Sequence, residues 1–180
     1  MLETGGRTDT SQASQMDEFR PLAIVDIDGV VADVRHRLHY LQSRPKNWDG
    51  FFAAAPSDPA HPEGLRLVTT LAADHEIIFL TGRPERLRRQ TVEWLGTHGV
   101  GGHQLAMRPD GDHRPAAQVK RDLLLAVAGG RTVGVVVDDD EIVLAALADA
   151  GYPTLAARWE QRLPEDSRAL LDAEEVDGET

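Results

Sequence analysis

The sequence predicts an α/β fold of three layers, with helices covering both faces of a mainly parallel sheet. Short apolar runs alternate with amphipathic helical patterns, and three of these runs end in acidic or hydroxyl residues. This alternation is typical of parallel sheets with helical crossovers. Ligands bind such folds beyond the carboxyl ends of the strands. The residues at these ends are therefore the first candidates for function.

Five apolar runs are expected to be strands, because continuous Val, Ile and Leu segments such as TVGVVV suit a sheet buried on both faces. Helices are expected where apolar residues recur three or four positions apart; Pro84 suits a first helical turn and Gly151 a helix end. The expected strands cover residues 21–27, 77–80, 104–107, 132–137 and 153–157, and the helices about 33–43, 62–73, 84–98, 115–128 and 140–150.

The 180 residues fit one domain, expected over 21–159. Residues 1–20 are polar and are expected to be a disordered extension, whereas 160–180 form an acidic tail with one short helix around 167–173. The chain has no cysteine, which excludes disulfides, thiol nucleophiles and Cys-ligated metals. It has neither an apolar run of about 18 residues nor a signal-peptide pattern, so we expect a cytoplasmic protein.

The net charge of −11 at first argues against a polyanionic partner. Its distribution removes that objection. Residues 1–20 carry four acids and two bases, and residues 160–180 carry eight acids and two bases. Most of the negative charge therefore belongs to the two ends rather than to the domain between them.

Two acids, Asp26 and Asp28, follow the first strand and are followed by Gly29. Residues two apart on a strand point the same way, and paired carboxylates repel each other unless a cation or a proton lies between them. The fourth strand is followed by four consecutive acids, Asp138-Asp139-Asp140-Glu141. One acid would cap the next helix, so four are more than a helix start requires. Oxygen ligands without Cys or His favour Mg²⁺.

Thr81-Gly82-Arg83 follows the second strand and combines a hydroxyl, a flexible residue and a guanidinium near a helix start, which suits an anion. On its own this motif fits an ordinary turn better. Lys120 lies between this motif and the acidic run. A surface lysine is the usual interpretation, but its place in this order makes it a candidate for the site.

The ordered set DIDGVVAD, FLTGRP, Lys120 and VVVDDDE resembles the four motifs of the haloacid dehalogenase (HAD) superfamily of phosphatases and phosphotransferases. The resemblance implies a Rossmann-like fold with strand order 3-2-1-4-5. The gaps between the motifs leave room for a minimal cap or none. Such an open site would admit macromolecular ends as well as small substrates.

Within that superfamily, DIDGVVADVRHR, TGR and GDHRPAAQVK resemble the 3′-phosphatase module of polynucleotide kinase-phosphatases, which implies a role in nucleic-acid repair. By this resemblance Arg37, Gly82, Arg83, Asp112 and Arg114 bind substrate. Val30 replaces the Thr common in the family. The companion kinase is not found in these residues, and the sequence does not identify a separate kinase or ligase partner.

The resemblance also implies roles at the reacting centre. Asp26 would be the nucleophile and Asp28 the general acid and base, while Thr81 and Lys120 would hold the phosphoryl oxygens. Mg²⁺ would be bound by Asp26, the Asp28 carbonyl and Asp138, with Asp139 as a further ligand.

Three functions remain open on the sequence alone. The first is a Mg²⁺-dependent phosphatase that removes 3′-phosphates from nucleic-acid ends. The second is a HAD phosphatase for nucleotides or other small phosphoesters. The third is a non-catalytic module that binds phosphate or nucleic acid.

Overall fold

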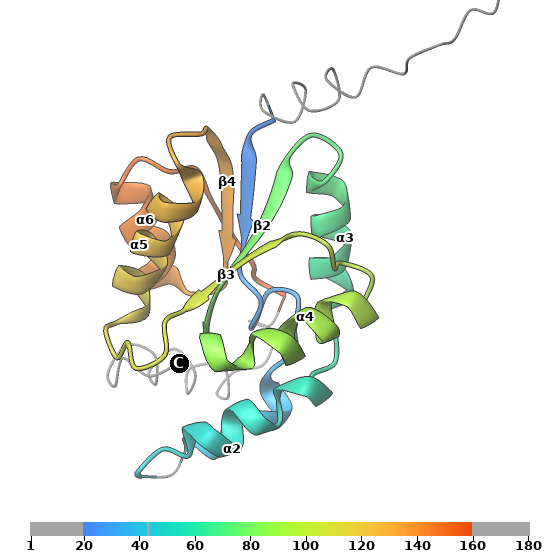
Figure 1. Ribbon diagram of the computed structural model, residues 1–180, viewed down its shortest axis with the longest axis vertical. Coiled ribbons are helices and arrows are strands. Elements are labelled where there is room, and N and C mark those ends of the chain that lie inside the picture. The colour runs from blue at the N-terminus through green and yellow to red at the C-terminus, as the bar shows by residue number, and fades with distance from the viewer. Residues whose placement is uncertain (1–19, 43, 160–180) are drawn as a thin grey trace, which may run out of the picture.

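The computed structural model describes residues 20–42 and 44–159, and its centre is a five-stranded parallel sheet (Figure 1). The strand order is β3-β2-β1-β4-β5, which confirms the predicted order. Every neighbouring pair is parallel, so all the carboxyl ends lie at one edge. The strands are β1 (Leu22–Val25), β2 (Glu76–Pro84), β3 (Gln104–Arg108), β4 (Val133–Asp138) and β5 (Thr154–Ala156).

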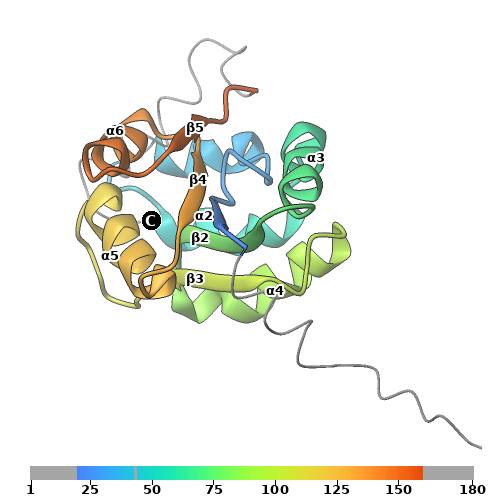
Figure 2. The same ribbon diagram turned by 90° about the horizontal axis from the view of Figure 1, so that it is seen from above.

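Helices cover both faces of the sheet, as the view from above shows (Figure 2). They confirm the predicted three layers and begin and end within a few residues of the expected positions. On one face lie α3 (Pro62–Leu71) and α4 (Arg88–Thr97), the latter preceded by the 3₁₀ turn η3 (Glu85–Leu87). On the other lie α5 (Ala116–Ala128) and α6 (Glu141–Asp149).

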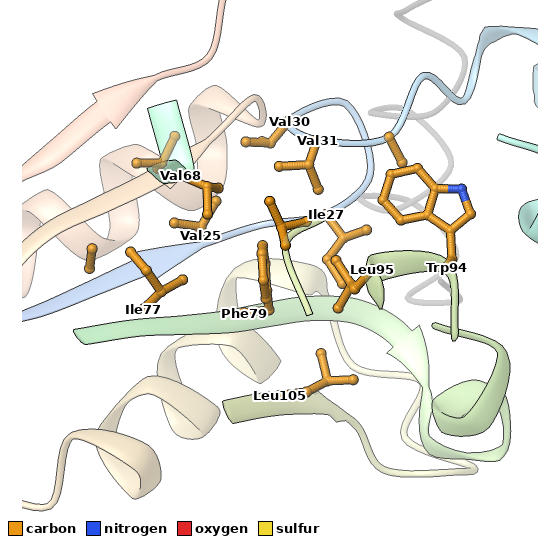
Figure 3. Packing of buried hydrophobic residues seen from close by; sticks show 14 of the residues in the cluster. Val25, Ile27, Val30, Val31, Val68, Ile77, Phe79, Trp94, Leu95 and Leu105 are labelled. Atoms are coloured by element: carbon orange, nitrogen blue, oxygen red, sulfur yellow. The ribbon is translucent and has the colours of Figure 1, made fainter. Parts of the chain in front are cut away.

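The alternation of side chains along β1 creates two apolar cores. Ala23 and Val25 belong to the cluster under α3 and α4, whereas Leu22 and Ile24 belong to the cluster under α5 and α6. Figure 3 shows the first cluster, in which Phe79 of β2 lies beside Ile27 and Leu95. Because β1 is buried on both faces, it holds the first acidic motif in a fixed position.

The segment between β1 and α3 lies beyond the carboxyl ends of the strands (Figure 1). The predicted helix over 33–43 is instead the 3₁₀ helix η1 (Arg35–Leu41). Three residues per turn place Leu38 and Leu41 on one line, and both are buried. The sequence did not indicate α2 (Trp48–Ala53) or the 3₁₀ turn η2 (Ala55–Ser57), which are too short to show a clear period.

Aromatic side chains give this segment a small core of its own. Trp48, Phe51 and Phe52 of α2 pack together and against residues of η1. The side chain of Asn47 accepts a hydrogen bond from the Gly50 amide at 2.8 Å and so caps α2. A compact segment, rather than a large cap, therefore borders the site.

No helix in the described part of the chain has the length and apolar character needed to cross a membrane. The helix expected around 167–173, the acidic tail and the extension before Arg20 lie outside the described residues.

Gly64 of α3 provides a test of how tightly the fold holds the turn after β1. A Cβ atom at Gly64 would lie 2.0 Å from the carbonyl oxygen of Val30. We expect Gly64→Ala to lower the free energy of unfolding by about 1–3 kcal/mol, because α3 must move away from this turn. Urea denaturation followed by circular dichroism measures the change.

Gly96→Ala in α4 is the matched control, since a Cβ atom there has no neighbour within 4 Å. It should leave stability unchanged or raise it by up to about 1 kcal/mol, because alanine is the better helix former. Equal effects of the two substitutions would show that α3 does not press on the turn.

Candidate active site

Asp26 follows β1 directly, and its amide donates to the carbonyl of Val137 in β4 at 2.9 Å. Just beyond it the chain folds into a tight turn, in which the Ile27 carbonyl accepts the amides of Val31 and Ala32 at 2.9 Å each. Gly29 has a φ of +74° in this turn, and a Cβ atom there would lie 2.0 Å from a carboxylate oxygen of Asp139. The glycine thus allows the first acidic motif to approach the second.

Lys120 of α5 joins the two acidic strand ends. Its Nζ lies 3.0 Å from Oδ2 of Asp26 and 2.9 Å from Oδ2 of Asp138, and all three side chains are buried. Burial raises the pKa of Asp26 to about 7; Lys120 opposes this shift, and the nearby Asp138 and Asp28 add to it. Burial likewise raises the pKa of Asp138. One lysine therefore does not fully compensate the two carboxylates.

The chemistry of the cluster fits a divalent cation. Asp26, Asp138 and Asp139 each offer a carboxylate oxygen, and these atoms lie within 4.8 Å of one another. Oδ1 of Asp26 is buried and has no hydrogen-bond partner among the described residues. A buried polar atom without a partner is costly, and an all-oxygen donor set suits Mg²⁺. The predicted metal ligands Asp26, Asp138 and Asp139 are thus brought together. The side chain of Asp28 forms ion pairs with two arginines instead.

The remaining acids of the DDDE run have ordinary structural partners. The Asp140 side chain accepts the amides of Ile142 and Val143 and caps α6, and Glu141 lies 3.3 Å from Arg158 at the surface.

Asp28 is held by two buried arginines. Its Oδ1 accepts hydrogen bonds from Arg37 Nη2 at 2.9 Å and from Arg83 Nε at 2.9 Å. Burial alone would raise the pKa of Asp28, but the two guanidinium groups outweigh it and lower that pKa to about 2. The structure thus places the expected substrate-binding residues Arg37 and Arg83 in ion pairs inside the protein.

Asp58 completes this network, and sequence reasoning missed it. Its carboxylate accepts from Arg37 Nε at 2.7 Å and from Arg83 Nη2 at 2.8 Å, and His36 Nε2 lies 2.8 Å away. The residue belongs to the proline-rich loop 56–62, which has no strand or helix pattern to place it. The sequence carried no signal for it, because the need for a second carboxylate arises from the burial of Arg37 and Arg83, which only the structure shows.

Thr81 and Gly82 lie in the last part of β2, which runs on to Pro84 instead of ending at residue 80 as the sequence predicted. Thr81 is buried, and its hydroxyl accepts the Arg83 amide at 3.2 Å. The Gly82 carbonyl accepts from Nε of Arg108, also buried, at 3.2 Å. These bonds hold the irregular last part of β2, where the sequence placed a phosphate-binding hydroxyl.

Asp112 and Arg114 lie in the loop between β3 and α5, in a different environment. Arg114 donates to Asp112 at 2.7 Å and to Asp122 at 2.8 Å, with half of its side chain exposed. The hydrogen bonds from Arg114 lower the pKa of Asp112 to about 2. The structure pairs these two expected substrate residues with each other at the surface, outside the buried cluster.

The arginine network should dominate local stability. Asp58→Asn keeps the shape of the side chain but leaves two buried guanidiniums with one carboxylate. We expect a loss of about 3 kcal/mol or more in the free energy of unfolding, measured by urea denaturation.

Asp122→Asn removes an acid from an exposed ion pair with Arg114 and serves as the control, with an expected change within about 1 kcal/mol. If Asp58→Asn proved as stable as this variant, the network would not be needed to hold the fold.

Comparisons with known proteins identify relatives of this fold. A chain in the structure of the Pnkp1/Rnl/Hen1 RNA repair complex matches with 21% identity and a TM-score of 0.66. The match covers 85% of this chain and 45% of that chain. A second structure of the Pnkp1/Rnl/Hen1 complex matches over 77% of this chain and 45% of that chain, with 22% identity and a TM-score of 0.64. This chain thus spans less than half of the length of those relatives.

A HAD-superfamily hydrolase from Geobacter sulfurreducens shares the fold with 16% identity and a TM-score of 0.51, over 85% of this chain and 95% of that one. No curated protein sequence matches. The model of the polynucleotide kinase PNKP phosphatase domain matches residues 21–158, which contain every side chain described above. The chain therefore belongs to the HAD phosphatases of the PNKP phosphatase-domain family.

Proposed function

We propose that the chain is a Mg²⁺-dependent phosphomonoesterase that works through an aspartyl-phosphate and removes 3′-phosphates from nucleic-acid ends. The observation that carries the proposal is the environment of Asp26. Its carboxylate has one oxygen held by Lys120 and a second that is buried without a hydrogen-bond partner among the described residues. A carboxylate fixed in this way is suited to attack and to metal binding rather than to structure alone.

In the first step an Asp26 oxygen forms a bond to phosphorus as the bond from phosphorus to the ester oxygen breaks. Thr81 and Lys120 would hold the phosphoryl oxygens, and Lys120 would compensate charge as the intermediate forms. Asp26, Asp138 and Asp139 would hold Mg²⁺, which when bound offsets the repulsion between a carboxylate and an anionic substrate.

Asp28 would transfer the protons. Arg37 and Arg83 keep its carboxylate ionised, but the low pKa that they impose weakens it as a base toward the water that attacks the phosphorylated Asp26. To protonate the leaving oxygen in the first step, Asp28 must gain a proton. We expect this to require weaker contacts with the two arginines when substrate is bound.

Two observations support a nucleic-acid end as the substrate. The family is that of a polynucleotide kinase phosphatase domain, and the fold is shared with a chain of an RNA repair complex. The segment beyond the strand ends contains only the short helices η1, α2 and η2, so we expect a phosphorylated strand end to reach the site.

The nucleophile assignment predicts the behaviour of Asp26→Asn. Phosphate release should fall by about a thousandfold or more, because the amide cannot attack phosphorus, while the far-ultraviolet circular dichroism stays unchanged. The substrates to compare are a 3′-phosphorylated oligonucleotide, a nucleoside 3′-monophosphate and a nucleoside 5′-monophosphate, each with Mg²⁺.

Asp149→Asn, at the exposed end of α6, is the charge-matched control and should keep full activity. Release mainly from the 5′-monophosphate would favour a small-molecule phosphatase. Binding of all three substrates without release from any would contradict the enzyme assignment.

The metal assignment predicts that Mg²⁺ raises the melting temperature of the wild type, because the cation relieves the repulsion among Asp26, Asp138 and Asp139. In Asp138→Asn this shift should largely vanish, and the Mg²⁺ concentration needed for half-maximal activity should rise by about tenfold or more. An identical Mg²⁺ dependence in the two proteins would rule out Asp138 as a ligand.

A further inference from the structure

Two residues just beyond β5 contact both acidic motifs of the site. The amide of Ala157 donates to the carbonyl of Asp138, the last residue of β4, at 2.8 Å. The indole Nε1 of Trp159 donates to the carbonyl of Val30 at 3.0 Å. Val30 lies in the turn that follows Asp26 and is 129 residues away from the tryptophan along the chain. The segment after β5 therefore joins the turn after β1 to the end of β4.

Packing holds the side chain of Trp159 in place. It lies against the apolar cluster under α3 and α4 and is partly buried. The ring of His61, itself buried at the start of α3, lies edge-on to the indole with ring centres 6.5 Å apart. A buried indole usually directs its N–H to an acceptor, and here that acceptor is the carbonyl of Val30. The donor of this hydrogen bond is thus fixed by its surroundings.

The turn that Trp159 contacts also forms one wall of the acidic cluster. A Cβ atom at Gly29 would lie 2.0 Å from Oδ2 of Asp139, so the backbone of the turn lies directly against this carboxylate. Val30 is the next residue, and its carbonyl accepts from the indole. A shift of the turn would change the space left for Asp139 and would move the carbonyl of Asp28, which we expect at the metal. The contact at Val30 thus acts on the predicted metal ligands through the backbone.

Hydrogen bonds within the turn have a different effect. Those accepted by the Ile27 carbonyl and donated by the Gly29 amide lie inside the turn and fix its shape. The Val31 carbonyl accepts the amide of His61 at 2.8 Å, which joins the turn to the loop before α3 rather than to β4. The indole comes from the segment that also holds Asp138, so its hydrogen bond sets the position of the first acidic motif relative to the second.

Metal affinity depends on how firmly the ligand oxygens are held. Groups that orient the ligands contribute about 10–100-fold to affinity, although they do not touch the ion. Mg²⁺ is a demanding ion because it requires near-ideal octahedral geometry. The oxygens of Asp26, Asp138 and Asp139 come from the ends of two strands, so the spacing of these two ends affects how well the cluster fits the ion.

We infer that Trp159 is a positioning residue for the metal site. Its indole N–H holds the turn after β1 beside the end of β4, so that the carboxylates of the two motifs stay together. Trp159 itself touches neither the ion nor the substrate. The inference rests on the Mg²⁺ site of the proposed function and adds to it a residue outside the four motifs.

The test measures Mg²⁺ binding without substrate. The full chain is titrated with MgCl₂ by isothermal titration calorimetry, and Trp159→Phe is compared with the wild type because phenylalanine keeps an aromatic ring but has no N–H. The Kd for Mg²⁺ should rise about tenfold, because the two strand ends are no longer held together by the indole. The half-saturating Mg²⁺ concentration for phosphate release should rise by the same factor, while kcat at saturating Mg²⁺ returns to the wild-type value.

A second variant separates the hydrogen bond from the packing. Replacement of Trp159 by 3-benzothienylalanine keeps the shape of the indole and removes only its N–H. It should weaken Mg²⁺ binding about as much as Trp159→Phe, because the lost group is the same. This variant decides the question if Trp159→Phe does not fold. Wild-type affinity for Mg²⁺ in the benzothienyl variant would overturn the inference.

Trp94→Phe is the matched control, because Nε1 of Trp94 also donates to a backbone carbonyl, that of Asp58, at 2.9 Å. Both phenylalanine variants should lower the melting temperature by about 2–4 °C, because each loses one buried hydrogen bond. Only the Trp159 variant should bind Mg²⁺ more weakly. Equal weakening of Mg²⁺ binding in the two variants would assign the effect to general stability and would overturn the positioning role.

The outcomes for the wild type separate this inference from the proposed function. Mg²⁺ binding that depends on Trp159, without phosphate release from any phosphomonoester, would support the positioning role and overturn the phosphatase. Phosphate release with an unchanged Mg²⁺ affinity in the Trp159 variants would overturn the positioning role and leave the phosphatase standing. A wild type that binds no Mg²⁺ would overturn the metal site and the positioning role together.

Discussion

The burial of carboxylates at one edge of the sheet is the constraint on which the rest of the site depends. Asp26 directly follows β1 and Asp138 is the last residue of the neighbouring β4, while Asp28 lies two residues beyond Asp26. Isolated buried charges are not tolerated, so each must be paired, protonated or bound to a cation. The buried Lys120 forms ion pairs with Asp26 and Asp138, and two buried arginines form ion pairs with Asp28. The lysine and the two arginines of the site therefore lie where they compensate the charge of the buried carboxylates.

These two groups of charges differ in a way that assigns different chemistry to similar residues. Asp26 shares one lysine with Asp138, and burial raises its pKa to about 7. Asp28 faces two arginines, which outweigh burial and lower its pKa to about 2. Two acids that are two positions apart in the chain therefore have opposite electrostatic environments. The proposed nucleophile Asp26 therefore needs a bound cation to stay ionised, whereas Asp28 is kept ionised by the two arginines.

The sequence was sufficient to predict what depends on periodicity and on order along the chain. The strands and the four covering helices followed from apolar patterns, and the strand order followed from the family resemblance. The convergence of Asp26, Lys120 and Asp138 followed from their positions at or between strand ends. It was insufficient for the segment between β1 and α3. There η1 and α2 are short, and the apolar contacts that hold them join one short element to the other.

Asp58 illustrates what pattern reasoning cannot supply. It lies in a loop between prolines, and its importance depends on Arg37 and Arg83, which are 21 and 25 residues away. The same contacts explain why these two arginines, expected at a substrate phosphate, are used inside the protein. Arg114 differs from them because its loop is exposed and provides Asp112 and Asp122 as nearer partners.

The central claim is that Asp26 carries the phosphoryl group during the reaction. Rapid acid quenching of the enzyme with a 3′-phosphorylated oligonucleotide and Mg²⁺, followed by peptide mass spectrometry, tests it directly. We expect one phosphoryl group on the peptide that contains Asp26, appearing before free phosphate and disappearing as the substrate is consumed. Phosphate release at full rate with Asp26 unmodified at every quench time would contradict the claim.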